Sequence, residues 1–320
     1  MATEAGGSRQ AEREAVLAAL GMTPAIHDEL LGYGDNPYLD LELPAEFPPL
    51  PPEPQVEAWR GYVAEAELEG AAAALSRRLP QLRFPVAEGV SQSPEYRAAT
   101  RRGDFDRAAP RVEGPLDEAP GKLELRLHAS PAGPVPVLVA RRRVDFVHLV
   151  RAFTCRNEPE PVPDSMGACL IKGLADWGRV DAYREAWERR RGAPGDEIAW
   201  SEEMARMAQR KELWQDRLIL VSTGPYSAVP ASEAGIEEGE WRERSVALRL
   251  AHECFHYLTL RLAGKIRSNL LDELIADYAG LVEAFGGYRE ELARRFLGVD
   301  RLPQLRPGGR LEVYRGDPPL

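Results

Sequence analysis

The sequence predicts an α+β fold, in which a small central β-sheet precedes a mainly helical C-terminal part. Three observations support this class. Strand-like runs are short and cluster in the middle of the chain, helical patterns fill the last third, and no internal repeat is present. A chain of 320 residues with 44% hydrophobic and 29% charged residues has the composition of a globular protein that buries a sizeable core.

Charge and cysteine content exclude several functional classes. The formal net charge of −10 disfavours binding to the phosphate backbone of nucleic acids. No stretch has 18 uncharged apolar residues, and the N-terminal segment lacks the apolar run of a secretory signal. Cys155, Cys169 and Cys254 are too few for a disulfide scaffold and are expected to be free thiols. We therefore expect a cytoplasmic protein that binds neither nucleic acid nor a membrane; its oligomeric state stays open.

Proline distribution divides the chain into three predicted parts. Residues 1–55 comprise a helix and a proline-rich strap, which is expected to be extended because each proline fixes φ and lacks an N–H donor. Residues 56–222 are expected to form an α+β domain with a short sheet, and residues 223–320 are expected to form a helical domain that carries the functional motif described below.

The secondary structure is predicted from hydrophobic periodicity and turn residues. Runs with the β-branched content or alternation of strands are Lys122–His128, Pro136–Ala140, Val144–Phe153 and Arg217–Ser222. Helical patterns occupy approximately residues 9–20, 56–78, 166–175, 180–191, 201–214, 241–262, 269–285 and 289–296. Strands followed mainly by helices are typical of the α+β class.

One motif dominates the functional interpretation. The segment from His252 to His256 reads HECFH and matches H-E-x-x-H within a helical pattern. Residues i and i+4 share one helix face, so both imidazoles can bind one metal ion at about 2.0–2.1 Å. Glu253 lies about 100° further round the helix, where a general base can take a proton from metal-activated water.

The next predicted helix carries carboxylates at matching levels. From His256 to the end of its helix is about 9 Å, and the return along the next helix to Glu273 is about 7.5 Å, at 1.5 Å per residue. An antiparallel pair therefore places Glu273 level with His256 and Asp277 level with His252. This arrangement predicts Glu273 as a metal ligand and Asp277 as the partner of an imidazole N–H.

Together, HECFH and DELIADYAG resemble the gluzincin metallopeptidases, the thermolysin-like group in which H-E-x-x-H is followed by E-x-x-x-D on the next helix. The resemblance covers about residues 245–286. It implies that His252, His256 and Glu273 bind one Zn²⁺ per chain and that Glu253 is the general base. It also implies that Asp277 supports a zinc-bound histidine.

These residues predict a zinc-dependent hydrolase, most simply a metallopeptidase that cleaves an amide bond of a peptide or protein substrate. The oxyanion donor that such a reaction needs is assigned to Tyr226, which follows the last predicted strand, with His148 and Arg249 as weaker candidates. Two alternatives stay open: a zinc enzyme that acts on a small molecule or modified peptide in a specialised pathway, and a non-catalytic scaffold that binds a partner. Without metal, the same side chains would form a buried polar network.

Overall fold

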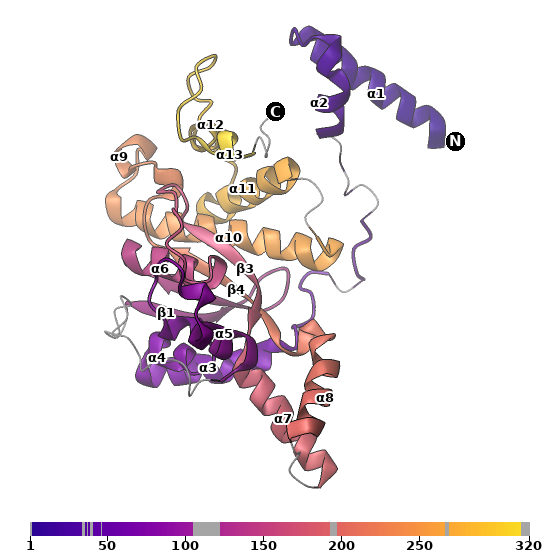
Figure 1. Cartoon of the computed structure of the whole chain (residues 1–320). Coiled ribbons are helices and arrows are strands. Elements are labelled where there is room, and N and C mark those ends of the chain that lie inside the picture. Colours follow the sequence, from indigo (N-terminus) through magenta and orange to yellow (C-terminus); the bar gives the residue numbers. More distant parts are fainter. Residues whose placement is uncertain are drawn as a thin grey trace.

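The computed structural model describes residues 2–33, 36, 38, 41–45, 47–104, 122–192, 197–265 and 269–314. It confirms the α+β class, because helices surround one mixed sheet with the strand order β1-β2-β4-β3 (Figure 1). Its strands are β1 (Leu123–His128), β2 (Val135–Ala140), β3 (Ala168–Ala175) and β4 (Gln215–Ser222). The central pair, β2 and β4, is parallel, whereas β1 pairs with β2 and β3 with β4 in antiparallel fashion.

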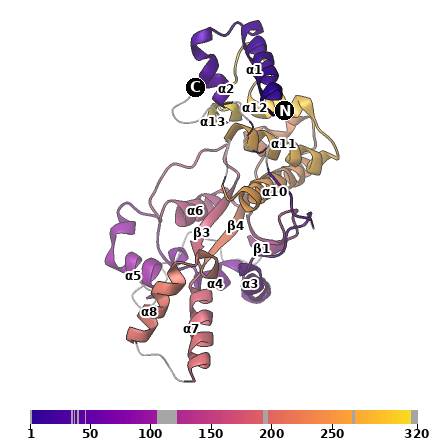
Figure 2. The same cartoon turned by 90° about the vertical axis from the view of Figure 1, so that its right-hand side faces the viewer.

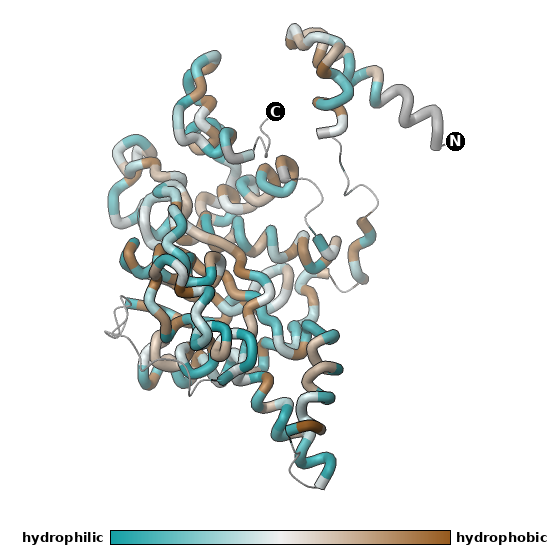
Figure 3. The backbone as a smooth tube through the Cα atoms, in the orientation of Figure 1, coloured by the Kyte–Doolittle hydropathy of each residue, from teal (hydrophilic) through white to brown (hydrophobic). Residues whose placement is uncertain are grey.

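The helices fall into groups along the chain. The α-helices of the described residues are α1 (Ala2–Ala19), α2 (His27–Tyr33), α3 (Gln55–Glu69), α4 (Ala71–Ser76), α5 (Pro94–Arg102), α6 (Arg143–Thr154), α7 (Trp177–Arg191), α8 (Glu197–Ala208), α9 (Ala231–Ala234), α10 (Glu238–Ala263), α11 (Asn269–Phe285), α12 (Glu290–Leu297) and α13 (Arg310–Tyr314). Helices α1 and α2 pack on each other and stand away from the sheet in both views (Figures 1 and 2). Helices α7 and α8 form a projecting hairpin with many hydrophilic residues (Figure 3).

The sheet separates two hydrophobic cores. Along β4, Leu218 and Leu220 face a core built with α3, α4 and α6. Ile219 and Val221 face a second core, built with α10. This alternation follows from the period of two in a strand, and all four side chains are fully buried. Helix α10 is thereby fixed across one face of the sheet, opposite α3 and α4 (Figure 1).

Both ends of α10 have identifiable local causes. Glu237 caps its N-terminus, since the carboxylate accepts hydrogen bonds from the backbone N–H groups of Gly239 and Glu240. Gly264, at φ 72°, ends the helix in the left-handed conformation that favours glycine. Between these ends α10 runs for 26 residues, so one continuous helix carries the predicted HECFH motif.

A glycine allows α11 to approach α10 closely. A Cβ atom at Gly280 would lie 2.8 Å from the backbone oxygen of Leu248, so a larger residue would separate the two helices. Leu281 and Phe296 then join α10, α11 and α12 in a third hydrophobic cluster. The close antiparallel pairing brings the carboxylates of α11 to the imidazoles of α10.

Two predicted elements are wrong. Residues Val144–Phe153, expected as a strand, form most of α6; Phe146, Leu149 and Val150 are buried at helical spacing against the sheet. Residues Met166–Ala175, expected as a helix, contain β3, which pairs with β4 and has a register shift next to Gly173. Pairing with a buried central strand outweighs the helical propensity of this Ala- and Leu-rich segment.

The proline-rich strap packs against the sheet and α10. The N–H of Leu50 donates to the carbonyl of Pro131 at 2.9 Å, and Leu50 joins the core beside α10. The Glu53 carboxylate accepts a hydrogen bond from the Tyr257 hydroxyl at 2.7 Å and forms an ion pair with Arg217. None of the described strap residues lines the cavity beside the HECFH motif.

Within the described ranges, no helix combines the length and the apolar character that crossing a bilayer requires.

Candidate metal centre

Three side chains converge between α10 and α11. The Nε2 atoms of His252 and His256 lie 2.9 Å apart. One Glu273 oxygen lies 3.3 Å from Nε2 of His252, and the other lies 3.5 Å from Nε2 of His256. One ligand atom from each residue falls within 4.8 Å of the other two, so the cluster could hold one metal ion.

The outer nitrogen of each imidazole is hydrogen-bonded to a carboxylate. Nδ1 of His252 lies 3.0 Å from Oδ1 of Asp277, and Nδ1 of His256 lies 2.5 Å from Oδ2 of Asp272. A carboxylate can only accept, so each Nδ1 carries the proton and each Nε2 of a neutral ring presents a lone pair. Two lone pairs 2.9 Å apart repel one another unless a cation lies near both. The donor set and its tautomers therefore fit a metal ion.

Electrostatics of the cluster show the same demand for positive charge. Burial lowers the pKa of His256, but hydrogen bonds with Asp272 and Glu273 outweigh burial and raise the pKa to about 10. For Glu273, burial raises the pKa, and the hydrogen bonds and charges of His252 and His256 outweigh it, so that the pKa falls well below its usual range. Without metal, a proton on His256 thus supplies positive charge to the site.

Glu253 borders the open side of the cluster. It lies on α10 and is only 7% exposed, and it lines a cavity of about 450 Å³ together with His252, His256 and Glu273. Strand β3 and the segment before it form the opposite wall, where Gly167 and Leu170 lie. The predicted general base and the three predicted ligands thus border one cavity.

Tyr226 lies behind His252. It follows β4, and its backbone N–H donates to the Ser245 hydroxyl at 3.0 Å. Its own hydroxyl donates to Asp277 at 2.9 Å and lies 3.5 Å from Nδ1 of His252, on the side of the ring away from Nε2. Burial is the main reason that the pKa of Tyr226 is raised, so the hydroxyl keeps its proton. In this arrangement Tyr226 positions Asp277; its role as an oxyanion donor stays a prediction.

Sequence reasoning missed Arg310, on α13. Its Nη1 donates to Asp277 at 2.6 Å and to the Tyr226 hydroxyl. Its Nη2 lies 3.3 Å from a Glu273 oxygen and 3.2 Å from Nε2 of His252. The guanidinium therefore brings positive charge to the atoms that would bind the metal. Arg310 is 33 residues from Asp277, and no motif links the two.

Two further supporting residues were missed as well. Tyr314 of α13 donates its hydroxyl to Oδ2 of Asp277 at 2.9 Å. Asp272, the partner of His256, directly precedes Glu273, and the helix-level argument that placed Glu273 also placed Asp272. The adjacent acidic pair was the available signal for Asp272, whereas Tyr314 had none.

The two weaker candidates for the oxyanion donor, His148 and Arg249, lie in different parts of the fold. His148 is buried on α6, which packs with α3 and α4 on the opposite face of the sheet from α10. Arg249 lines the metal cavity, one turn of α10 before His252. The three cysteines are free, and burial raises the pKa of Cys254 to about 12, so this thiol stays protonated within the core.

The fold and the site together define an α+β protein with a candidate metal centre made by two antiparallel helices. The chain belongs to the family of unknown function DUF7005, whose model matches residues 15–320. No curated protein and no solved structure gave a significant match.

Proposed function

We propose that this protein is a zinc-dependent hydrolase, namely a metallopeptidase that cleaves an amide bond in a peptide or protein. The observation that carries the proposal is the orientation of the two imidazoles: both Nε2 atoms face Glu273, while Glu253 of the same helix lines the adjoining cavity. Two imidazoles and one carboxylate are the protein ligands of several catalytic zinc sites. The resemblance of residues 245–286 to the gluzincins supports the same class.

Each residue has a defined task in this reaction. His252, His256 and Glu273 would hold a zinc ion, which would supply Lewis-acid polarisation and make water more acidic, with a pKa of about 7. The Glu253 carboxylate takes a proton from the attacking water and returns it to the leaving amine. Arg310 has its Nη1 held by Asp277, and its Nη2 lies beside Glu273 and His252, from where it can donate to the substrate oxygen on which negative charge develops.

Two alternatives differ in what they require. A zinc enzyme for a small molecule or modified peptide uses the same residues and fails to cleave unrelated peptides. A partner-binding scaffold does not depend on Glu253 for any turnover. The free Cys155, Cys169 and Cys254 support action in a reducing compartment, the cytoplasm.

The first experiment measures metal by mass spectrometry in protein purified without added metal or chelator. We expect about one zinc per chain, lost in His256→Ala and retained in His27→Ala, a variant of a half-buried histidine on α2, outside the cluster. Absence of metal from the wild type, even after incubation with zinc, would contradict the proposal.

The second experiment measures turnover on a mixture of quenched fluorogenic peptides. Glu253→Gln is expected to retain zinc and to lose turnover by a factor of about 10² to 10⁴, as removal of a general base implies. Glu243→Gln, at an exposed position of the same helix, is the matched control and is expected to retain wild-type turnover. Equal turnover by the two variants would exclude Glu253 as the base.

A further inference from the structure

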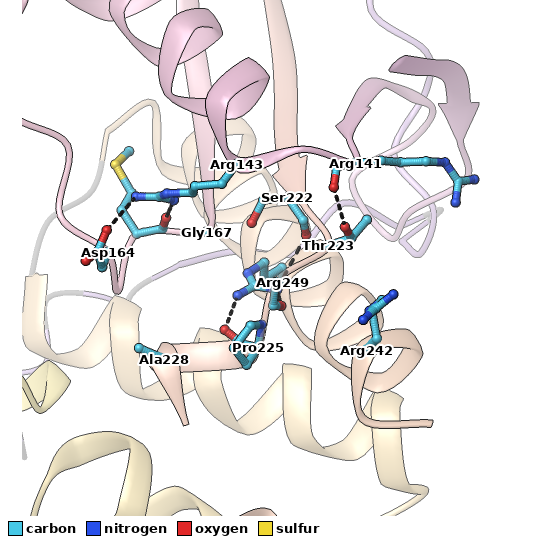
Figure 4. A pocket seen from close by; sticks show the side chains of 12 residues that line it. Arg141, Arg143, Asp164, Gly167, Ser222, Thr223, Pro225, Ala228, Arg242 and Arg249 are labelled. Carbon is cyan, nitrogen blue, oxygen red and sulfur yellow. Dashed lines mark hydrogen bonds and ion pairs between the residues drawn. The ribbon is translucent and has the colours of Figure 1, made fainter. Parts of the chain in front are cut away.

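A second cavity adjoins the metal cavity on the side of β4. It has a volume of about 510 Å³, and Met166, Gly167 and Arg249 line both cavities. Four arginines and one aspartate are the charged residues of its lining, and we call it the arginine pocket. The arginines are Arg141, Arg143, Arg242 and Arg249 (Figure 4).

Arg249 is the buried member of the arginine pocket. The residue is only 4% exposed, and its guanidinium donates to the carbonyls of Gly224 at 2.5 Å and Pro225 at 2.6 Å. Among the residues that the structure describes, none places a carboxylate within ion-pair distance of Arg249. Burial lowers its pKa to about 10, which still leaves it charged at neutral pH. A buried charge without a counter-ion is unfavourable, and an anionic ligand would relieve this cost.

Helix α10 connects Arg249 to the metal centre. Arg249, His252, Glu253 and His256 occupy positions i, i+3, i+4 and i+7, so they share one face of the helix. All four line the metal cavity. With a rise of 1.5 Å per residue, Arg249 precedes His252 by about 4.5 Å along the helix axis. A single extended molecule can therefore reach both the metal cluster and Arg249.

The other arginines differ in what they contribute. Figure 4 shows Arg249 in the middle of the arginine pocket, with Arg143 and Arg242 on either side of it and the Arg141 guanidinium directed away. Arg143 is held by the carbonyls of Met166 and Pro163, at 2.5 and 2.6 Å. Arg242 is 62% exposed at its side chain, and its ion pair with Glu238 is long, at 3.8 Å.

We propose that the arginine pocket is a substrate-binding site for an oxyanion group, a carboxylate or a phosphate, carried next to the bond that is cleaved at the metal centre. That the bound molecule is a substrate rests on the proposed function, but binding of the anion itself does not require metal. Guanidinium groups suit both oxyanions because their N–H donors match the spacing of two oxygen atoms. The substrate class would accordingly be an acidic peptide, a peptide with a nearby free C-terminus, or a phosphorylated molecule.

The test measures binding of small anions to the full chain by isothermal titration calorimetry at low salt. Succinate and inorganic phosphate are the probes, and neutral succinamide is the control for succinate. We expect one or both anions to bind and succinamide not to bind. The anion that binds more tightly distinguishes a carboxylate site from a phosphate site. Absence of binding by both anions at about 10 mM, tenfold above a Kd of about 1 mM, would overturn the proposal.

Variants locate the binding site. Arg249→Lys keeps the charge but not the planar fork and is expected to weaken binding about tenfold, the effect of losing a charged hydrogen bond. Since Arg249 also holds backbone carbonyls, Arg242→Gln is the second variant; it is expected to weaken binding about two- to fivefold. Arg206→Gln is the control, because Arg206 is an exposed helical arginine outside the pocket, paired with Glu203 at 2.7 Å and Glu202 at 3.9 Å. Equal effects of Arg242→Gln and Arg206→Gln on anion affinity would overturn the proposal.

The metal-site variant separates this proposal from the proposed function. Anions also bind to zinc, so the titrations are repeated with His256→Ala. Retention of binding in His256→Ala, with sensitivity to Arg242→Gln, supports the arginine pocket even in a protein that holds no zinc. Loss of all anion binding in a folded His256→Ala protein assigns the anion to the metal and contradicts the pocket.

Discussion

His256 and Asp272 form a direct hydrogen bond between neighbouring helices, with Nδ1 2.5 Å from Oδ2. Asp272 is 2% exposed, so its carboxylate is enclosed together with the imidazole that it orients. On the other imidazole, Asp277 does the same for His252. The two carboxylates fix which nitrogen of each ring faces the cluster, and this orientation is the feature on which metal binding depends.

Replacement of Asp272 by asparagine is expected to weaken zinc binding about 10- to 100-fold, because the neutral amide no longer raises the basicity of His256. Competition with a chromophoric chelator measures the affinity. Asp164→Asn, at a fully exposed position outside the cluster, provides the control and should bind zinc as the wild type does. Equal affinity of both variants would show that Asp272 has no part in metal binding.

Arg310→Met is expected to strengthen zinc binding about tenfold, since it removes a positive charge within 3.3 Å of two ligand atoms. The same chelator competition measures it. Arg294→Met, which removes an exposed arginine of α12 paired with Glu290, should leave the affinity unchanged. Weaker zinc binding in Arg310→Met would mean that the guanidinium organises the ligands more than it repels the ion.

Stability of the metal-free protein should fall as pH rises from about 6.5 to 10. His256 has a pKa of about 10 in the folded protein, raised above its unfolded value of about 6.5, so protonation stabilises the fold below pH 6.5. This contribution is lost as pH passes through 10 and amounts to a few kcal/mol in order of magnitude. Urea unfolding in the presence of chelator measures the slope. A wild-type slope equal to that of His256→Asn over this range would contradict the assignment.

Gly280→Ala is expected to lower the free energy of unfolding by about 1–3 kcal/mol, because the new methyl group would lie 2.8 Å from the Leu248 carbonyl. Gly61→Ala is the matched control: this glycine lies inside α3 with no atom within 4 Å of the added Cβ. Alanine there should stabilise the protein by about 0.5–1 kcal/mol. Destabilisation of similar size in both variants would exclude close helix packing as the cause.

The sequence predicted the helix pair well because each helix is long and its motif is local. The rise per residue in an antiparallel helix pair placed Glu273 and Asp277 level with the two imidazoles. Arg310 could not be predicted, because α13 reaches the cluster through packing that no spacing rule describes. The same limit explains why the predictions for α6 and β3 were wrong. Short apolar segments allow either a helix or a strand, and packing on the sheet determines which one forms.

Asp277 forms hydrogen bonds with groups from three separate segments of the chain: Tyr226 after β4, His252 on α10, and both Arg310 and Tyr314 on α13. The last of these groups lies 88 residues after the first. During synthesis on a ribosome, a nascent chain that already contains the HECFH motif still lacks Arg310 and Tyr314, and its Asp277 has only part of its partners. Completion of the Asp277 contacts therefore requires α13, which is synthesised after α10 and α11.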